Sequence, residues 1–131
     1  MNINKFTQKS LEAVQKCEKL AYEYGNQQIE QEHLLYSLLT VEDSLILKLI
    51  TKMNVQKEQF LNEAAQAIEK LPKVSGGQLY ISNDLNKVLI SAEDEAKAMG
   101  DEYVSVEHLF LAMLKQPSRM VKELFRSYGI T

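Results

Sequence analysis

The chain has 131 residues, of which 45% are hydrophobic and 25% charged, and its 15 Lys and Arg against 18 Asp and Glu give a net charge of −3. This mildly acidic balance argues against a nucleic-acid-binding surface, which needs clustered Lys and Arg. No apolar run approaches the roughly 20 residues of a membrane span, and no signal peptide opens the sequence. The single cysteine, Cys17, excludes an intramolecular disulfide and fits a reducing compartment. We therefore expect a cytoplasmic protein that binds neither nucleic acid nor membrane.

The first predicted element is a helix, in keeping with a composition of only five Gly and two Pro among many helix-forming residues. Thr7 stands where its hydroxyl can cap the free amides of the first turn, and Gly25 follows as a residue that tolerates positive φ. One helical face is marked by a 3-4-3 spacing of Val14, Cys17, Ala21 and Tyr24. This segment is predicted to be amphipathic.

Three more helices are expected before residue 72. The second begins at a cap on Glu30, with Ile29 and Leu34 in the spacing of a hydrophobic staple, and the third stops at Asn54. The buried faces of these two are predicted to be Leu34, Leu35, Leu38 and Leu39, and then Leu45, Ile46, Leu49, Ile50 and Met53. The fourth helix carries Phe60, Ala64, Ala67, Ile68 and Leu71, and Pro72 ends it.

The same pattern recurs in the second half of the chain, where residues 81–130 align with 6–55 without a gap. Caps recur at Ser82 and Ser105, and the triplet Glu-His-Leu recurs at 107–109. The matching apolar faces are Leu89, Ala92, Ala96 and Met99; Leu109, Phe110, Met113 and Leu114; and Met120, Val121, Leu124, Phe125 and Tyr128. We predict an all-α fold made of a pseudo-twofold pair of four-helix repeats, with repeat one at 1–71, a flexible linker at 72–80 and repeat two at 81–131. The second copy stops before its fourth helix, so we expect a longer natural chain.

Motifs that carry chemistry are mostly absent. None of the five glycines is followed by Lys, which excludes a Gly-Lys-Ser or Gly-Lys-Thr phosphate-binding loop. His33 and His108 each follow a Glu, and adjacent helical positions cannot direct both side chains at one metal, so a packing or capping role is predicted. Cys17 lies on an apolar stripe and is predicted to be a core residue, not a nucleophile. We expect no metal, no cofactor and no enzymatic activity in this segment; acid-base catalysis by Glu32, Glu107 and the histidines is the enzymatic alternative.

Polar residues that recur in both copies are the candidates for binding. Thr7 and Ser82 are interpreted first as helix caps, whose hydroxyls could also touch a ligand in an exposed groove. Glu32 and Glu107 complement the helix dipole or, being placed alike in two copies, receive a cationic partner. The linker carries three apolar residues, Val74, Leu79 and Tyr80. They are expected to pack into or line the seam between the copies.

Several blocks together carry a family resemblance: Phe6-Thr7 opening a helix, EQEHLLYSLL, LPKVSGG and GDEYVSVEHLFLAML. Over essentially the whole chain they resemble the amino-terminal domain of the Clp family of AAA+ ATPases. The ClpB disaggregase branch is the most similar, and the ClpC and ClpA branches come next. The resemblance implies a domain that binds clients and does not hydrolyse ATP, attached to two nucleotide-binding modules that lie outside this sequence.

The partners implied by the resemblance are unfolded or aggregated polypeptides and adaptor proteins, which the domain passes to the pore of a homohexameric ring. ATP and Mg²⁺ would belong to the modules of the parent, and the isolated domain is expected to be a monomer. A Clp peptidase is a further partner in the ClpC and ClpA branches. A free-standing adaptor with no ATPase attached is the alternative from a different class.

The resemblance also implies site residues. Client contacts in the family fall on Thr7, Asp101 and Glu107, and the ClpC-like pockets for phosphorylated arginine match Thr7 with Glu32 and Ser82 with Glu107. We expect a shallow apolar groove with a carboxylate rim, which weakly binds extended segments rich in apolar and basic residues. The predicted site comprises Thr7, Glu32, Tyr80, Ser82, Asp101 and Glu107.

Overall fold

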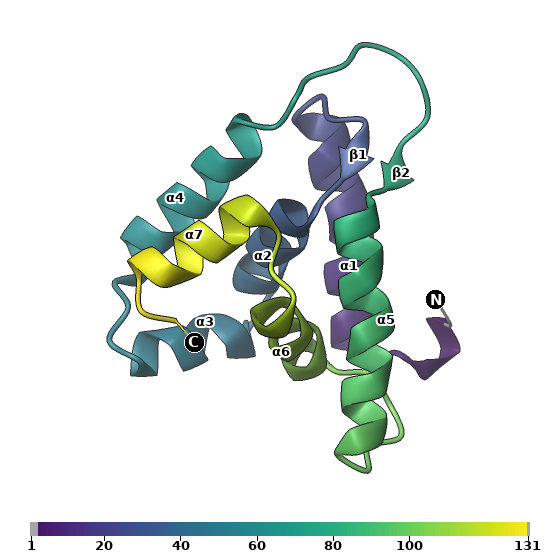
Figure 1. Ribbon diagram of the computed structural model, residues 1–131, viewed down its shortest axis with the longest axis vertical. Helices are drawn as coiled ribbons and strands as arrows, with labels where there is room; N and C mark the ends of the chain where they lie inside the picture. Colours follow the sequence, from purple (N-terminus) through teal and green to yellow (C-terminus); the bar gives the residue numbers. More distant parts are fainter. Residues whose placement is uncertain (1–2, 131) are drawn as a thin grey trace.

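The computed structural model describes residues 3–130, which form seven α-helices, a short 3-10 helix and two short strands (Figure 1). In chain order these are η1 (Ile3–Lys5), α1 (Gln8–Glu23), β1 (Gln28–Ile29), α2 (Gln31–Thr40), α3 (Leu45–Lys52), α4 (Lys57–Glu69), β2 (Tyr80–Ile81), α5 (Asn83–Ala98), α6 (Val106–Lys115) and α7 (Arg119–Ser127). The all-α prediction is confirmed, although the two strands were not predicted.

Helices α1 and α5 occupy equivalent positions in the two copies, and each begins directly after its predicted cap. The hydroxyl of Thr7 accepts from the N–H of Ser10 at 3.2 Å, and that of Ser82 accepts from the N–H of Leu85 at 3.1 Å. The glycines that follow the two helices both have φ of +73°, the left-handed conformation that ends a helix. The predicted caps and stops are therefore confirmed in both copies.

Helices α2 and α6 are also equivalent in the two copies, and each begins with a backbone-to-histidine hydrogen bond. The N–H of Glu30 donates to Nδ1 of His33 at 2.9 Å, and the N–H of Ser105 donates to Nδ1 of His108 at 2.9 Å. Each histidine thus satisfies an amide at the helix N-terminus, which confirms the predicted capping role. Because Nδ1 accepts in both rings, it is Nε2 of each ring that can donate.

Two short parallel pairings join the copies in a crossed manner. In β1 and β2, Ile29 pairs with Ile81, and outside the strands Phe6 pairs with Val104. In the alignment of the two copies, Phe6 corresponds to Ile81, and Ile29 corresponds to Val104. Each pairing therefore joins the entry to the first helix of one copy to the entry to the second helix of the other, as a pseudo-twofold arrangement requires.

The core is continuous through both copies, and α2 lies at its centre, in contact with every other α-helix that the structure describes (Figure 1). Its buried leucines are the four predicted from the sequence: Leu34, Leu35, Leu38 and Leu39. Ser37 lies among them and donates from Oγ to the carbonyl of Ala13 at 2.6 Å, which satisfies its buried hydroxyl. Cys17 is buried in the same core, as predicted.

The predicted buried face of the third helix is only partly correct. In α3, Ile46 and Ile50 are buried, whereas Leu45, Leu49 and Met53 are exposed. In α7, which corresponds to α3 in the second copy, Val121, Leu124 and Phe125 are buried. There α4 lies alongside α7 (Figure 1), and the Phe60 ring meets the Tyr128 ring edge-on with 5.0 Å between centroids.

Two other expectations need correction. Met99, predicted to lie on the buried stripe of the fifth helix, is exposed because it caps a last turn of α5 that extends beyond the other helices (Figure 1). The predicted linker 72–80 ends earlier than expected, because Tyr80 belongs to β2. Of its three apolar residues, Leu79 packs against the core as expected, whereas Val74 and Tyr80 are exposed. The N–H of Val74 donates to the carbonyl of Gly25 at 2.9 Å, so this connection is anchored to the first copy.

Within residues 3–130, no helix combines the length and the apolar character that crossing a bilayer would need.

Candidate functional site

An open pocket of about 200 Å³ lies where the N-terminal ends of α1 and α6 meet the loop between α2 and α3. Its lining comprises Thr7, Lys9, Leu38, Val41, Glu42, Asp43, Ser44, Leu45, Ser105, Val106 and Glu107. The apolar lining comes from Leu38, Val41, Leu45 and Val106, while the exposed Glu107 adds a carboxylate. The exposed acids Glu42 and Asp43 of the first repeat lie at the pocket with Glu107 of the second, beside the cation Lys9, so its charge is mainly negative and comes from both repeats.

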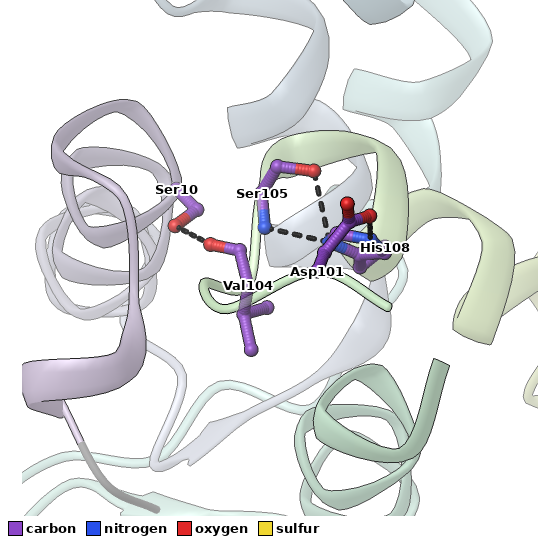
Figure 2. Close-up of polar contacts among 5 residues, drawn as sticks. All are labelled: Ser10, Asp101, Val104, Ser105 and His108. Atoms are coloured by element: carbon purple, nitrogen blue, oxygen red, sulfur yellow. Dashed lines mark hydrogen bonds and ion pairs between the residues drawn. The ribbon is translucent and has the colours of Figure 1, made fainter. Parts of the chain in front are cut away.

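Thr7 is held beside this pocket by contacts that cross between the repeats. Its N–H donates to the carbonyl of Val104 at 2.9 Å, and Oγ of Ser10 donates to the same carbonyl at 2.7 Å (Figure 2). Because Ser10 also donates its N–H to the Thr7 hydroxyl, the start of α1 is fixed relative to the start of α6. This brings Thr7 of the first repeat and Glu107 of the second into one site.

A hydrogen-bonded chain extends from the pocket to Asp101. Ser105 lines the pocket and donates its N–H to Nδ1 of His108, and Nε2 of His108 donates to Oδ2 of Asp101 at 2.8 Å (Figure 2). The Asp101 side chain is 49% exposed, whereas His108 is buried. The histidine thus positions a second carboxylate beside the loop that leads into α6.

The equivalent histidine of the first copy has a different partner. Nε2 of His33 donates to Oδ1 of Asn26 at 2.9 Å, and Asn26 corresponds to Asp101. Both side chains are buried, and burial lowers the pKa of His33 to about 4. The same geometry therefore carries a neutral amide in one repeat and an acid in the other.

Two further polar candidates lie at the pseudo-symmetric counterpart of the pocket, which is closed. Glu32 and Ser82 are each only 5% exposed. Burial raises the pKa of Glu32 to about 7, and the carboxylates of Glu30 and Asp84 act in the same direction. The structure therefore brings Thr7 together with Glu107, not with Glu32, because the crossed pairings place each first helix beside the second helix of the other repeat.

Tyr80 lies apart from the pocket. It is 50% exposed on β2, beside Ile81, which lines a second hollow of about 200 Å³ between α1 and α5. That hollow is mainly apolar and is lined by Leu11, Val14, Gln15, Cys17, Glu18, Ile29, Leu34, Ile81, Leu85 and Leu89. Of the six predicted site residues, Thr7 and Glu107 line the same pocket, and Asp101 is linked to it through His108 and Ser105.

Burial raises the pKa of Cys17 to about 12, so it remains an unreactive thiol in the core. Among the described residues, no group of three His, Cys, Asp or Glu side chains is placed to hold a metal ion.

Sequence reasoning missed Lys9 and Leu45 as pocket residues. Lys9 donates from Nζ to the carbonyl of Glu42 at 3.0 Å and ties α1 to the loop before α3. Its counterpart Asp84 has the opposite charge, so the repeat offered no signal. Leu45 was assigned to the core because helical spacing alone cannot tell a buried stripe from one that lines an open pocket.

The fold and the duplicated helix entries agree with a known family. The family model described as the Clp repeat (R) N-terminal domain matches residues 5–128. The chain belongs to this Clp N-terminal domain family. It is 37% identical to the chaperone protein ClpB of Nitratidesulfovibrio vulgaris over 137 aligned residues, which cover 100% of this chain. It is 46% identical to the ClpB of Porphyromonas gingivalis over 114 residues, or 87% of this chain. It spans only 16% and 13% of the lengths of these two relatives.

Solved Clp N-domains have the same fold. The Hsp104 N-terminal domain from Candida albicans superposes with a TM-score of 0.86 at 20% identity, covering 97% of this chain and 83% of that one. A ClpV N-domain in complex with a VipB peptide superposes with a TM-score of 0.78 at 20% identity, covering 96% of this chain and 80% of that one. At these identities the likeness shows the fold alone.

Proposed function

We propose that this chain is the client- or adaptor-binding N-terminal domain of an ATP-dependent Clp chaperone of the ClpB type. The observation that carries the proposal is the open pocket, in which Thr7 and Glu107 from opposite repeats meet over an apolar lining. A recognition site on a chaperone needs access, apolar surface and little sequence discrimination, and this pocket offers the first two beside the Glu107 carboxylate.

The chemistry of the pocket favours apolar segments that carry Lys or Arg. Leu38, Leu45 and Val106 can bury part of an aliphatic or aromatic side chain, and Glu107 can pair with a neighbouring cation. Asp101 lies on the hydrogen-bonded chain behind Ser105 and adds negative charge nearby. Because the pocket holds about one side chain, we expect weak binding, with a Kd that is roughly micromolar or higher.

Membership of the family supports a proposal for the role of the parent protein. We propose that further modules of a longer chain supply ATP hydrolysis in a hexameric ring, to which this domain delivers unfolded or aggregated polypeptide. The identities of 37% and 46% to ClpB proteins support the disaggregase branch over a branch that feeds a peptidase. The ClpV N-domain solved with a VipB peptide is a second domain of this fold that binds a peptide.

The test is an amide NMR titration of the chain with a short unstructured peptide that alternates Leu and Arg and has an amidated C-terminus. Shifts should concentrate at Thr7, Lys9, Ser105 and Glu107. A matched peptide with Glu in place of Arg should bind more weakly, because it meets like charge. Shifts spread evenly over the surface, or confined to residues outside the pocket, would overturn the site assignment.

A further inference from the structure

The closed counterpart of the pocket is filled by the side chain of Gln31. This residue is 1% exposed, and its Nε2 donates to the carbonyls of Asp84 at 3.0 Å and Gln116 at 2.9 Å. Its Oε1 accepts from the N–H of Ser118 at 2.9 Å. Both donor hydrogens and one acceptor position of the carboxamide are therefore used, so its burial is stable.

The position of Gln31 in its repeat is that of Val106 in the other, which lines the open pocket. Two of the residues that anchor Gln31, Asp84 and Gln116, correspond to Lys9 and Val41, which also line the open pocket. A ligand in the open pocket would lie beside Lys9 and Val41 of repeat one. The Gln31 side chain occupies the equivalent volume beside Asp84 and Gln116 of repeat two.

The flanking residues support this equivalence. Glu32 and Ser82 correspond to Glu107 and Thr7 and are buried, whereas Glu107 is exposed and Thr7 is half-buried. The two copies therefore share a hydroxyl and a carboxylate at these positions, and the side chain next to the carboxylate differs, Gln31 in one copy and Val106 in the other. The pairs Lys9/Asp84 and Val41/Gln116 also differ, but Gln31 contacts only the backbone carbonyls of Asp84 and Gln116. Valine is too short to reach the carbonyls that Gln31 contacts and has no polar atom to satisfy them.

We propose that Gln31 is an internal plug that closes one of two pseudo-symmetric client pockets, so that the domain binds one client segment at a time. The residue at positions 31 and 106 decides whether the pocket of each repeat is open. This inference rests on the proposed function, because it takes the Thr7–Glu107 pocket as the client site.

The experiment exchanges the two residues in the full chain and uses the Leu/Arg peptide as the probe. In the Gln31→Val variant, amide shifts are expected at Ser82, Asp84 and Gln116 in addition to those at Thr7 and Glu107. In the Val106→Gln variant, affinity should fall roughly tenfold or more, the factor that accompanies loss of one well-buried side-chain contact. Gln28→Val, at an exposed position of β1, serves as the matched control and should leave the wild-type pattern unchanged.

The outcomes separate this inference from the proposal it rests on. If the peptide causes no amide shifts at Thr7 and Glu107 of the wild-type chain, the proposed function itself is refuted. Wild-type shifts at that pocket, together with a folded Gln31→Val variant that shows none at Ser82 and Asp84, would refute the plug alone. Because Gln31→Val removes the three hydrogen bonds of a buried side chain, this variant can fail to fold. Val106→Gln therefore gives an independent test, and unchanged affinity in that folded variant would also overturn the plug.

Discussion

His108 holds Asp101 through a hydrogen bond of 2.8 Å from Nε2 to Oδ2, which joins the first turn of α6 to the loop after α5. We expect Asp101→Asn to keep this bond, because Asn26 accepts from His33 in the same arrangement. Asp101→Ala leaves the Nε2–H of a buried ring without its partner and should lower the free energy of unfolding by about 1 kcal/mol. Urea unfolding of both variants measures the difference, and equal stabilities would show that water replaces the carboxylate.

Glu107 is expected to contribute charge to client binding and little to folding. Glu107→Gln should weaken binding of the Leu/Arg peptide severalfold and reduce the salt dependence of the affinity, because the exposed carboxylate pairs with a cation. Glu58→Gln is the matched control, since Glu58 is also an exposed acid in the first turn of a helix. Isothermal titration at two salt concentrations checks the prediction, which fails if both variants lose affinity equally.

Glu32 should make the fold less stable as pH rises. Its pKa is raised from 4.5 to about 7, so its contribution to the free energy of unfolding is fully present below about pH 4.5 and is lost as pH rises through 7. His33 has the opposite effect, because its pKa is lowered from 6.5 to about 4 and its contribution is lost as pH falls from 6.5 through 4. Between about pH 4.5 and 6.5 the two effects oppose each other.

In the Glu32→Gln variant, the pH dependence of stability that comes from His33 should therefore be seen without the opposing effect of Glu32. Between about pH 4.5 and 6.5, the unfolding free energy of the variant should rise by about 1.4 kcal/mol per pH unit relative to that of the wild-type chain. The difference between the two unfolding free energies should approach about 3 kcal/mol near neutral pH. Urea unfolding at several pH values measures the slopes. Parallel curves for the two proteins would mean that folding does not raise the pKa of Glu32.

Cys17 should be inert in the folded chain. It is buried, and its pKa of about 12 leaves almost no thiolate near neutral pH, so an alkylating reagent should label it only after unfolding. Cys17→Ala, which installs the residue found at the equivalent Ala92, should cost about 1 kcal/mol of stability. Mass spectrometry with and without urea follows the labelling, and rapid labelling of the native chain would contradict the burial.

Much of the fold could be predicted because its signals are local. Caps such as Thr7 and Glu30 and the stops after α1 and α5 depend on hydrogen bonds and φ values within a few residues. The repeat gave a second, independent indication of each helix start, since the starts of α1 and α2 recur at the equivalent positions of α5 and α6. The exposed face of α3 was not predictable in this way, because helical spacing alone does not determine which apolar residues, such as Leu49, the tertiary packing covers.

The site was predictable only in its residue types. The repeated Glu and the repeated hydroxyl marked Glu32, Glu107, Thr7 and Ser82 as candidates, but a symmetric sequence predicted a symmetric pair of sites. A signal for the difference was present, since Gln31 and Val106 differ although each is followed by Glu-His-Leu. The consequence of this difference depends on the residues that the tertiary structure places next to Gln31 and Val106.

Seven helices, the N-caps of α1, α2, α5 and α6 and the duplication follow from the amino-acid sequence alone, because backbone hydrogen bonding and amphipathic spacing act over one or two turns. The meeting of Thr7 with Glu107 and the burial of Glu32 depend instead on how the two repeats pack. The crossed pairings of Phe6 with Val104 and of Ile29 with Ile81 bring each first helix to the other repeat. One side chain of different length then leaves one pocket open and the other filled.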